Sequence, residues 1–324
     1  HTVQVDPFSI DLYEISNESF LEFINELGAI EEACDDEDCL TLEDSAIKLD
    51  GDLFVVDEEL LTHPVSGASW FGASAYCEWR GDRLPTEAEW ELAAGWDFEN
   101  ETRLAYPWGD EFDGNITNFC DGNCPESQAN EDYDDGYEFT SPVGSYEDGR
   151  SPAGLYDVAG NLWEWVSDWY HPDYYDESPE ENPTGPDSGK DKVVRGGSWF
   201  DTGNFTSTAV RFPAPPDESG DSIGFRCASD EFDEALAISQ KPADSEAAEE
   251  TPEPTATEEP TATVEPTEEP TATEEPTATV EPTEEPTATE EPTATAEPTE
   301  EPTATAEPTE EPTATAEPTE EPTA

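Results

Sequence analysis

The feature that most constrains this chain is a proline-threonine-glutamate repeat that fills its last quarter. From about Thr251 to Ala324 the residues are almost only Pro, Thr, Ala and Glu, and the closing stretch repeats the decamer EEPTATAEPT. The segment has no aromatic residue, so it cannot bury enough apolar surface to form a core. Proline fixes its own φ and pushes the preceding residue toward extended geometry. We therefore expect an extended stalk that resembles polyproline II.

The repeat also predicts the length and the decoration of this stalk. At about 3.1 Å per residue it would reach roughly 230 Å when fully extended, and repulsion between Glu side chains stiffens it further. Almost every Pro is followed by Thr, which is typical of O-glycosylated, mucin-like stalks. The candidate glycosylated residues are Thr261, Thr267, Thr277, Thr283, Thr293, Thr299, Thr303, Thr309, Thr313 and Thr319.

The part of the chain before the repeat has a globular composition. It is rich in Trp, Tyr, Phe and Gly, and it is long enough to bury one sizeable core. The predicted organisation is a head over residues 1–230, an acidic linker over 231–250 and the stalk over 251–324.

The charge of the chain limits its partners. The net charge is −72, and residues 1–240 carry 57 acidic against 10 basic residues, a net charge of −47. Such a surface repels nucleic acid and anionic membranes, and no apolar run reaches membrane length. We expect neither nucleic-acid binding nor membrane insertion. A solvated acidic surface explains most of these acids, while cations, high salt or a positively charged partner would suit it.

Six cysteines form three plausible pairs. Two pairs are tight, Cys34 with Cys39 and Cys120 with Cys124, and the third joins Cys77 to the distant Cys227. An even count with tight pairs indicates disulfides and an oxidising compartment. The alternatives, reduced thiols or a zinc site, fit less well because the chain has only three His and unusual spacings for zinc.

The expected location is extracellular or on a cell surface. The sequence starts at His1 without Met, as a mature secreted protein does after its leader is removed. Sequons for N-glycosylation occur at Asn17, Asn100, Asn115 and Asn204, a motif that is also frequent by chance.

Regular elements are predicted mainly in the first hundred residues. Residues 3–10 alternate as a strand does. The expected helices begin after Ser16 or Asn17 and at a capping box that starts at Thr86, with another over about 71–80 that ends at Gly81. Mostly irregular structure is predicted for residues 31–59 and 107–227. Disulfides or metal ions would have to hold these loops in place. The inward positions are predicted as Phe20, Phe23, Ile24 and Leu27 before a stop at Gly28, and as Trp90, Ala93 and Ala94 before a stop at Gly95.

Five motifs occur in order along the head. They are RLPTEAEW at 83–90, YPWG at 106–109, GLYDVAGNLWEW at 154–165, VRGGSW at 194–199 and IGFRCA at 223–228. Together they resemble the formylglycine-generating-enzyme, or sulfatase-modifying-factor, family over about residues 1–229. The resemblance implies an irregular α+β fold of C-type-lectin-like topology with little regular secondary structure.

The resemblance implies two calcium sites. Calcium takes six to eight hard oxygen ligands, and a glycine-bearing loop can turn its carbonyls toward an ion. The alternative is that the acidic residues only cap and bridge loops; Asp132 and Asp134 could also replace a ligand of the second site. The first set is the Asp157 and Glu164 side chains with the Gly160 and Leu162 carbonyls, and the second is the Asn118 and Asp135 side chains with the Phe119 and Tyr137 carbonyls.

The same resemblance argues against the family's oxidase chemistry. In formylglycine-generating enzymes two cysteines after the Gly-Gly-Ser-aromatic motif bind copper, and those positions correspond here to Asp201 and about Thr206. Neither side chain is the soft thiolate that holds Cu(I). Cys77 and Cys227 match a structural disulfide of the family. We expect no copper and no formylglycine-generating activity.

Two further enzyme hypotheses are weaker. The wider superfamily includes non-haem iron enzymes, but His63 and His171 lack a third partner apart from His1. The cleft that is the active site in the family could be lined here by Asp168, Asp201 and Arg211, which would permit acid–base chemistry.

Three functions follow, in order of preference. The first is a non-catalytic structural glycoprotein that self-associates into a fibre or surface layer, with a calcium-stabilised head on a glycan-bearing stalk. The second is a lectin-like or adhesive head on a stalk, for which the aromatic run 169–175 offers a surface that could stack on carbohydrate or on another subunit. The third is a divergent metal-dependent enzyme.

Overall fold

The computed structural model describes residues 2–27, 34 and 37–231 of the 324-residue chain. The chain divides into two units, His1–Glu249 and Glu250–Ala324. Apart from Glu231, the predicted linker and the predicted stalk with all its candidate threonines lie outside the described residues.

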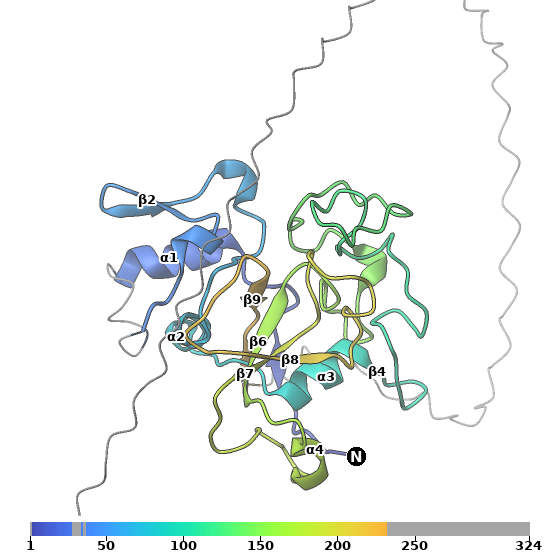
Figure 1. Ribbon diagram of the computed structural model, residues 1–324. Helices are drawn as coiled ribbons and strands as arrows, with labels where there is room; N and C mark the ends of the chain where they lie inside the picture. The colour runs from blue at the N-terminus through green and yellow to red at the C-terminus, as the bar shows by residue number, and fades with distance from the viewer. Residues whose placement is uncertain (1, 28–33, 35–36, 232–324) are drawn as a thin grey trace, which may run out of the picture. The chain divides into compact units, whose positions relative to one another are not determined.

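A four-stranded sheet forms the centre of the head (Figure 1). One of its two inner strands is β6 (Trp163–Trp169), which pairs antiparallel with the other, β7 (Lys192–Arg195), and parallel with β9 (Ile223–Phe225). Strand β8 (Arg211–Ala214) completes the sheet on the outer side of β7.

The two faces of this sheet carry two hydrophobic clusters. Successive residues of a strand point to opposite faces, so Trp165 and Val166 of β6 enter different clusters. Trp165 packs with aromatic residues of the helices α1 (Asn17–Leu27) and α2 (Trp70–Arg80). Val166 packs with Trp90 of α3 (Glu87–Gly95).

Helix α1 begins where the capping rule predicts. Ser16 is the N-cap, since its Oγ accepts from the backbone N–H of Ser19 at 3.3 Å. Phe20, Phe23 and Ile24 are buried as predicted. Leu27 is 41% exposed, so its predicted inward position is wrong, because it lies on the last turn beyond the packed face. Gly28 lies outside the described residues.

Helices α2 and α3 confirm their predicted boundaries closely. Gly81 ends α2 with a φ of 91°, a left-handed conformation that suits glycine. At the start of α3, Thr86 Oγ1 accepts from Glu89 N at 3.2 Å and Glu89 Oε2 accepts from Thr86 N at 2.8 Å. This is the predicted capping box, and Trp90, Ala93 and Ala94 are buried behind it. Gly95 is the last residue of α3.

The predicted strand over 3–10 is mostly wrong. Only β1 (Ser9–Ile10) is a strand, and it pairs with β10 (Ala228–Ser229), which brings the two ends of the head together. Earlier in the segment Gln4 makes a single bridge to Glu181. Pro7 interrupts the ladder because proline has no N–H to donate.

The predicted loops contain short regular elements. Within 31–59, β2 (Lys48–Asp50) and β3 (Leu53–Val55) form a hairpin. Residues 107–227 are indeed rich in loops, yet they supply the whole central sheet. The remaining elements are the 3₁₀ turns Leu42–Asp44, Glu58–Leu60 and Glu147–Gly149, the strands β4 (Trp96–Asp97) and β5 (Thr102–Arg103), and the short helix α4 (Tyr174–Glu177).

Candidate functional site

The first candidate site lies where the loop before β6 enters the sheet. Asp157 and Glu164 are both buried, at 6% and 0% exposure, and Asp157 sits in the left-handed region with a φ of 58°. Glu164 is engaged at both oxygens by Arg226, at 2.7 Å each, and its Oε2 also accepts from Trp90 Nε1 at 2.8 Å. Gly160 and Leu162 lie on the short segment between the two acids.

The structure adds Glu14, which the sequence reasoning missed. Its carboxylate is 3% exposed and accepts from the backbone N–H of Leu162 at 3.1 Å and from Asn161 Nδ2 at 2.6 Å. Burial, and then the charges of Asp157 and Glu164, raise the pKa of Glu14 well above its ordinary value. Burial also raises the pKa of Asp157 to about 6, against the lowering effect of a hydrogen bond from Gly144 N.

This donor set suits a hard cation. Asp157 Oδ1 is buried without a hydrogen-bond partner in the described part of the chain, and an unpaired buried carboxylate oxygen is costly. Three buried carboxyls face one arginine. A cation would satisfy the orphaned oxygen and offset the excess negative charge. Within residues 2–27, 34 and 37–231, no three His, Cys, Asp or Glu side chains would hold a metal by themselves, so the site would depend on main-chain carbonyls.

The second candidate site adjoins the first. Asn118 Oδ1 is also buried without a hydrogen-bond partner among the described residues, while Asn118 Nδ2 donates to Asn161 Oδ1 at 3.3 Å. Burial raises the pKa of Asp135 to about 7, and Asp135 Oδ1 accepts from Tyr137 N at 2.9 Å. Phe119 follows Asn118 directly and is buried.

Two aspartates that could replace a ligand of the second site, Asp134 and Asp132, have different surroundings. Asp134 Oδ1 accepts from Asn123 Nδ2 at 2.8 Å. Asp132 is exposed at the loop surface, and its backbone N–H donates to Asn130 Oδ1. Both sets of predicted calcium ligands therefore stay predictions, with an orphaned buried oxygen in each as the observation that fits an ion.

Asp201 and Thr206, which the resemblance matches to the family's copper-binding cysteines, have structural partners. Asp201 Oδ2 accepts from Trp163 Nε1 at 2.7 Å and from Ser198 Oγ at 2.6 Å. Thr206 is fully buried and donates from Oγ1 to Gly203 O at 3.0 Å. Both side chains hold the loop after β7 in place.

All six cysteines are used in disulfides. The bridges join Cys77 to Cys227 and the two tight pairs Cys34–Cys39 and Cys120–Cys124, as predicted. No thiol is left for metal or redox chemistry.

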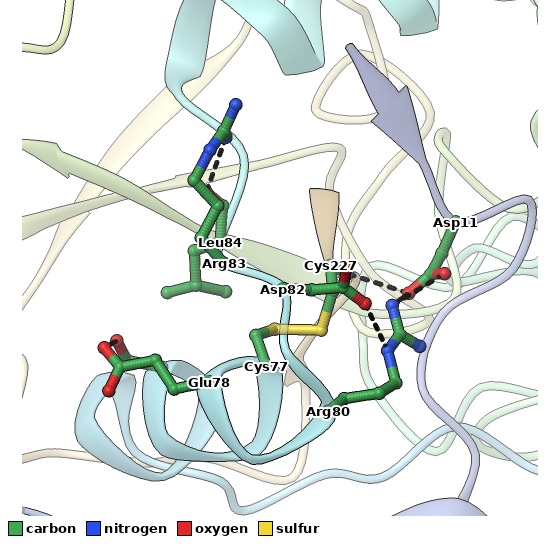
Figure 2. Close-up of a disulfide and its surroundings, with 9 residues drawn as sticks. Asp11, Cys77, Glu78, Arg80, Asp82, Arg83, Leu84 and Cys227 are labelled. Carbon is green, nitrogen blue, oxygen red and sulfur yellow. Dashed lines mark hydrogen bonds and ion pairs between the residues drawn. A yellow bond between two sulfur atoms is a disulfide. The ribbon is translucent and has the colours of Figure 1, made fainter. Parts of the chain in front are cut away.

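The Cys77–Cys227 bridge ties α2 to the segment just before β10 (Figure 2). Beside it, Arg80 at the end of α2 pairs with Asp11 at 2.7 Å and with Asp82 at 2.6 Å. Asp11 also accepts from the backbone N–H of Cys227 at 3.0 Å. The disulfide, these ion pairs and the hydrogen bond therefore together hold the two ends of the head close to each other.

The histidines and the aromatic run have separate environments. His63 Nδ1 lies 3.0 Å from Thr140 Oγ1, His171 is exposed, and His1 lies outside the described residues. In the aromatic run, Trp169 packs on Lys192, and Arg211 lies 4.7 Å from the rings of Tyr170 and Tyr175. Tyr175 is 37% exposed, whereas Trp169, Tyr170 and Tyr174 are half-buried, so the run is only partly exposed.

The sequons separate into two groups. Asn17 is 1% exposed and donates to Leu60 O at 2.9 Å, so it is inaccessible to modification in the folded head. Asn100, Asn115 and Asn204 are exposed.

The fold is that of an α+β, C-type-lectin-like head of the formylglycine-generating-enzyme type. Its fold resembles the solved structure of Treponema denticola variable protein 1, with a TM-score of 0.50 and 21% identity over 71% of this chain and 86% of the other. The sequence matches the family described as sulfatase-modifying factor enzyme 1-like domain over residues 1–231. The chain belongs to that family.

Curated relatives carry different activities in their names. The formylglycine-generating enzyme of Streptomyces coelicolor is 36% identical over 71% of this chain and 80% of its own length. The inactive C-alpha-formylglycine-generating enzyme 2 of Mus musculus is 33% identical over 70% of this chain and 76% of its own. Serine/threonine-protein kinase pkn1 of Chlamydia caviae is 37% identical over 70% of this chain, but the match spans only 34% of the kinase-named protein.

No helix in the described part of the chain is long and apolar enough to cross a membrane.

Proposed function

We propose that this chain is a non-catalytic extracellular structural glycoprotein, with a calcium-stabilised head and a glycan-bearing stalk. The observation that carries the proposal is the pair of positions Asp201 and Thr206. Both side chains are tied into the fold by hydrogen bonds, and all cysteines are in disulfides. Copper-dependent oxidation of a cysteine needs a thiolate ligand that these residues do not supply.

The three disulfides support the extracellular part of the proposal, because such bonds persist in oxidising compartments. The stalk composition supports the glycoprotein part. In a fibre or surface layer formed by self-association, the stalk would act as a spacer, because repulsion between its Glu side chains keeps it extended.

The enzymatic side is tested with a cysteine-containing sulfatase-type peptide. The full chain is incubated with the peptide, Cu(I) and oxygen, and the peptide is analysed by mass spectrometry. We expect no formylglycine, while a formylglycine-generating enzyme run in parallel converts the peptide. Conversion by this chain would overturn the non-catalytic role.

Calcium binding is tested by calorimetric titration of the chelated protein. We expect two binding events, of which Asp157→Asn removes one and Asp135→Asn the other. Asp57→Asn is the matched control, because Asp57 is an exposed acid paired with Lys48 at 2.8 Å and lies in neither site. A chelated head that takes up no calcium would remove the metal from the proposal.

The structural role is tested on the native material. Mass spectrometry should find glycans on the threonines of the repeat, and light scattering should find assemblies larger than one chain. A monodisperse monomer with unmodified threonines would contradict the role.

A further inference from the structure

A cleft of about 770 Å³ lies near the end of β6 that is remote from Asp201. Asp201 is held by Trp163 at the start of β6, whereas Ser167 of the same strand lines the cleft. At about 3.3 Å per residue, these two positions are roughly 13 Å apart along the strand. The cleft is therefore separate from the place where the family's oxidase cysteines would be.

The floor of the cleft is a buried ammonium group held between indole rings. Lys192 is 4% exposed, and its Nζ lies 3.8 Å from the ring centre of Trp70 and 4.0 Å from that of Trp169. Nζ donates one hydrogen bond to Ser167 O at 2.7 Å. The other N–H groups of this ammonium face the two indole rings, so Lys192 acts by fixing the aromatic walls in place.

The Trp70 wall is fixed in orientation. Its Nε1 donates to the carbonyl of Val166 at 2.9 Å, and its ring is pinned on one side by Lys192. An aromatic side chain held in this way offers a rigid apolar surface at little conformational cost, beside polar groups that set the orientation of a ligand.

The rim of the cleft carries both hydrogen-bond donors and hydrogen-bond acceptors. Asp6 and Asn182 are joined by two hydrogen bonds, at 2.8 and 2.9 Å. Arg83 bridges Glu89 at 2.7 Å and Asp230 at 2.5 Å. A sugar hydroxyl both donates and accepts, so a rim of paired carboxylates, amides and a guanidinium suits a ligand with many hydroxyl groups.

The charge favours a neutral ligand. The head carries a large net negative charge, which repels anions. The guanidinium of Arg83 is already neutralised by its two carboxylates. Lys192 alone is a weak counterpart for an acidic ligand in that field.

A second cleft adjoins the first. It measures about 410 Å³, shares Val5 and Pro183 with the larger cleft, and is lined by Trp96, Tyr174 and Tyr175. The two tyrosines belong to the aromatic run 169–175, for which the sequence predicted stacking on carbohydrate or on another subunit. Two adjoining clefts with aromatic walls fit a chain of several sugar units better than a single one.

We propose that the cleft between Trp70, Lys192 and the segment 182–184 binds a neutral oligosaccharide. The ring of one unit lies against the indole of Trp70, which Lys192 holds from its other face, and hydroxyl groups pair with the rim. The proposal goes beyond the structural role above, and it needs neither the calcium sites nor the loss of the oxidase cysteines.

The test uses the full chain, labelled and applied to an array of neutral hexasaccharides of glucose, mannose, galactose and N-acetylglucosamine. Compounds that bind are then titrated against two variants. Ser74→Trp places an indole into the cleft that Ser74 lines, and Glu22→Trp places the same side chain on the exposed face of α1, away from the lining of either cleft. We expect Ser74→Trp to weaken binding at least about tenfold and Glu22→Trp to leave it unchanged.

Hydrogen–deuterium exchange on the unaltered chain gives a second measurement that does not depend on how a variant folds. A bound hexasaccharide should protect residues 70–74 and 182–184. The proposal is overturned if no neutral hexasaccharide binds, if protection falls elsewhere, or if a folded Ser74→Trp variant binds as well as Glu22→Trp. The peptide and calcium experiments above have other readouts, so the two proposals fail separately.

Discussion

At the scale of single residues, Arg226 is the cation that faces the buried carboxyls Glu14, Asp157 and Glu164. Removing one partner of a buried ion pair leaves an uncompensated charge and typically costs about 3–5 kcal/mol. We expect Arg226→Met to lower the free energy of unfolding by that amount in urea titrations run with EDTA, where no calcium can compensate.

The matched control for this prediction is Arg150→Met. Arg150 also pairs with a glutamate, Glu147, but its side chain is 43% exposed, and exposed pairs contribute about 0–1 kcal/mol. A loss in Arg226→Met no larger than in the control would contradict the role given to the buried pair.

Asp168 gives the head a predictable pH dependence. Burial, and to a lesser degree the charge of Glu87, raise its pKa from an ordinary 3.8 to about 7. The folded state then holds a proton that the unfolded state has lost, so this stabilisation is complete below pH 3.8 and disappears as the pH rises through 7. Asp168→Asn replaces the titrating carboxyl by a neutral amide, so the variant lacks this pH dependence.

We therefore expect the stability of Asp168→Asn relative to the unaltered protein to rise by about 3 kcal/mol between pH 5 and pH 8. Urea titrations of both proteins at pH 5, 6, 7 and 8 measure the difference. A difference that stays constant across this range would show that Asp168 does not titrate as described.

Glu14 shows why the candidate site could be predicted only in part. The resemblance supplied Asp157 and Glu164 because they lie inside one continuous motif. Glu14 lies 148 residues from Leu162, whose N–H it accepts, and no local pattern links the two. Its only sequence signal was an acidic residue between apolar positions, just before the cap of α1.

At the scale of elements, the disulfides should differ in their contribution to stability. The Cys77–Cys227 bridge spans 150 residues and Cys34–Cys39 spans 5. Cross-linking restricts the unfolded chain more when the closed loop is longer, and loss of a native bridge costs about 2–5 kcal/mol. We expect replacement of both Cys77 and Cys227 by Ser to lower the Tm more than the same double replacement of Cys34 and Cys39.

Differential scanning calorimetry of the two double variants measures this difference, and both must keep the native circular dichroism spectrum. Equal shifts in Tm, or a larger shift for the short loop, would contradict the argument.

Helices and strands of the head differed in how well they could be predicted. Thr86, Glu89 and Gly81 are local signals, since each acts on backbone groups within four residues, and the helices beside them were predicted closely. Strand β6 has no such signal, because consecutive residues such as Trp165 and Val166 are buried on opposite faces and period-two alternation disappears. Its parallel partner β9 begins 60 positions later, at Ile223 opposite Trp163, so only tertiary packing selects that pairing.

At the scale of the whole molecule, the net charge of −47 over residues 1–240 should make the stability of the head depend on salt. Like charges on a compact surface repel one another and destabilise the folded state. The screening length falls from about 10 Å at 0.1 M salt to about 3 Å at 1 M. We expect the Tm to rise by about 5 °C over this range, because a gain of 1–2 kcal/mol corresponds to a shift of that size in a domain of 150–250 residues.

The measurement is a thermal melt at 0.1 M and 1 M NaCl with EDTA present, which separates general screening from specific calcium binding. KCl should give the same shift as NaCl, because screening depends on ionic strength and not on the identity of the monovalent cation. Sucrose is the control for effects that do not involve charge, since it strengthens burial by exclusion from the surface. If the Tm stayed constant or fell with salt, the acidic residues would have to be paired or dispersed well enough that their repulsion no longer opposes folding.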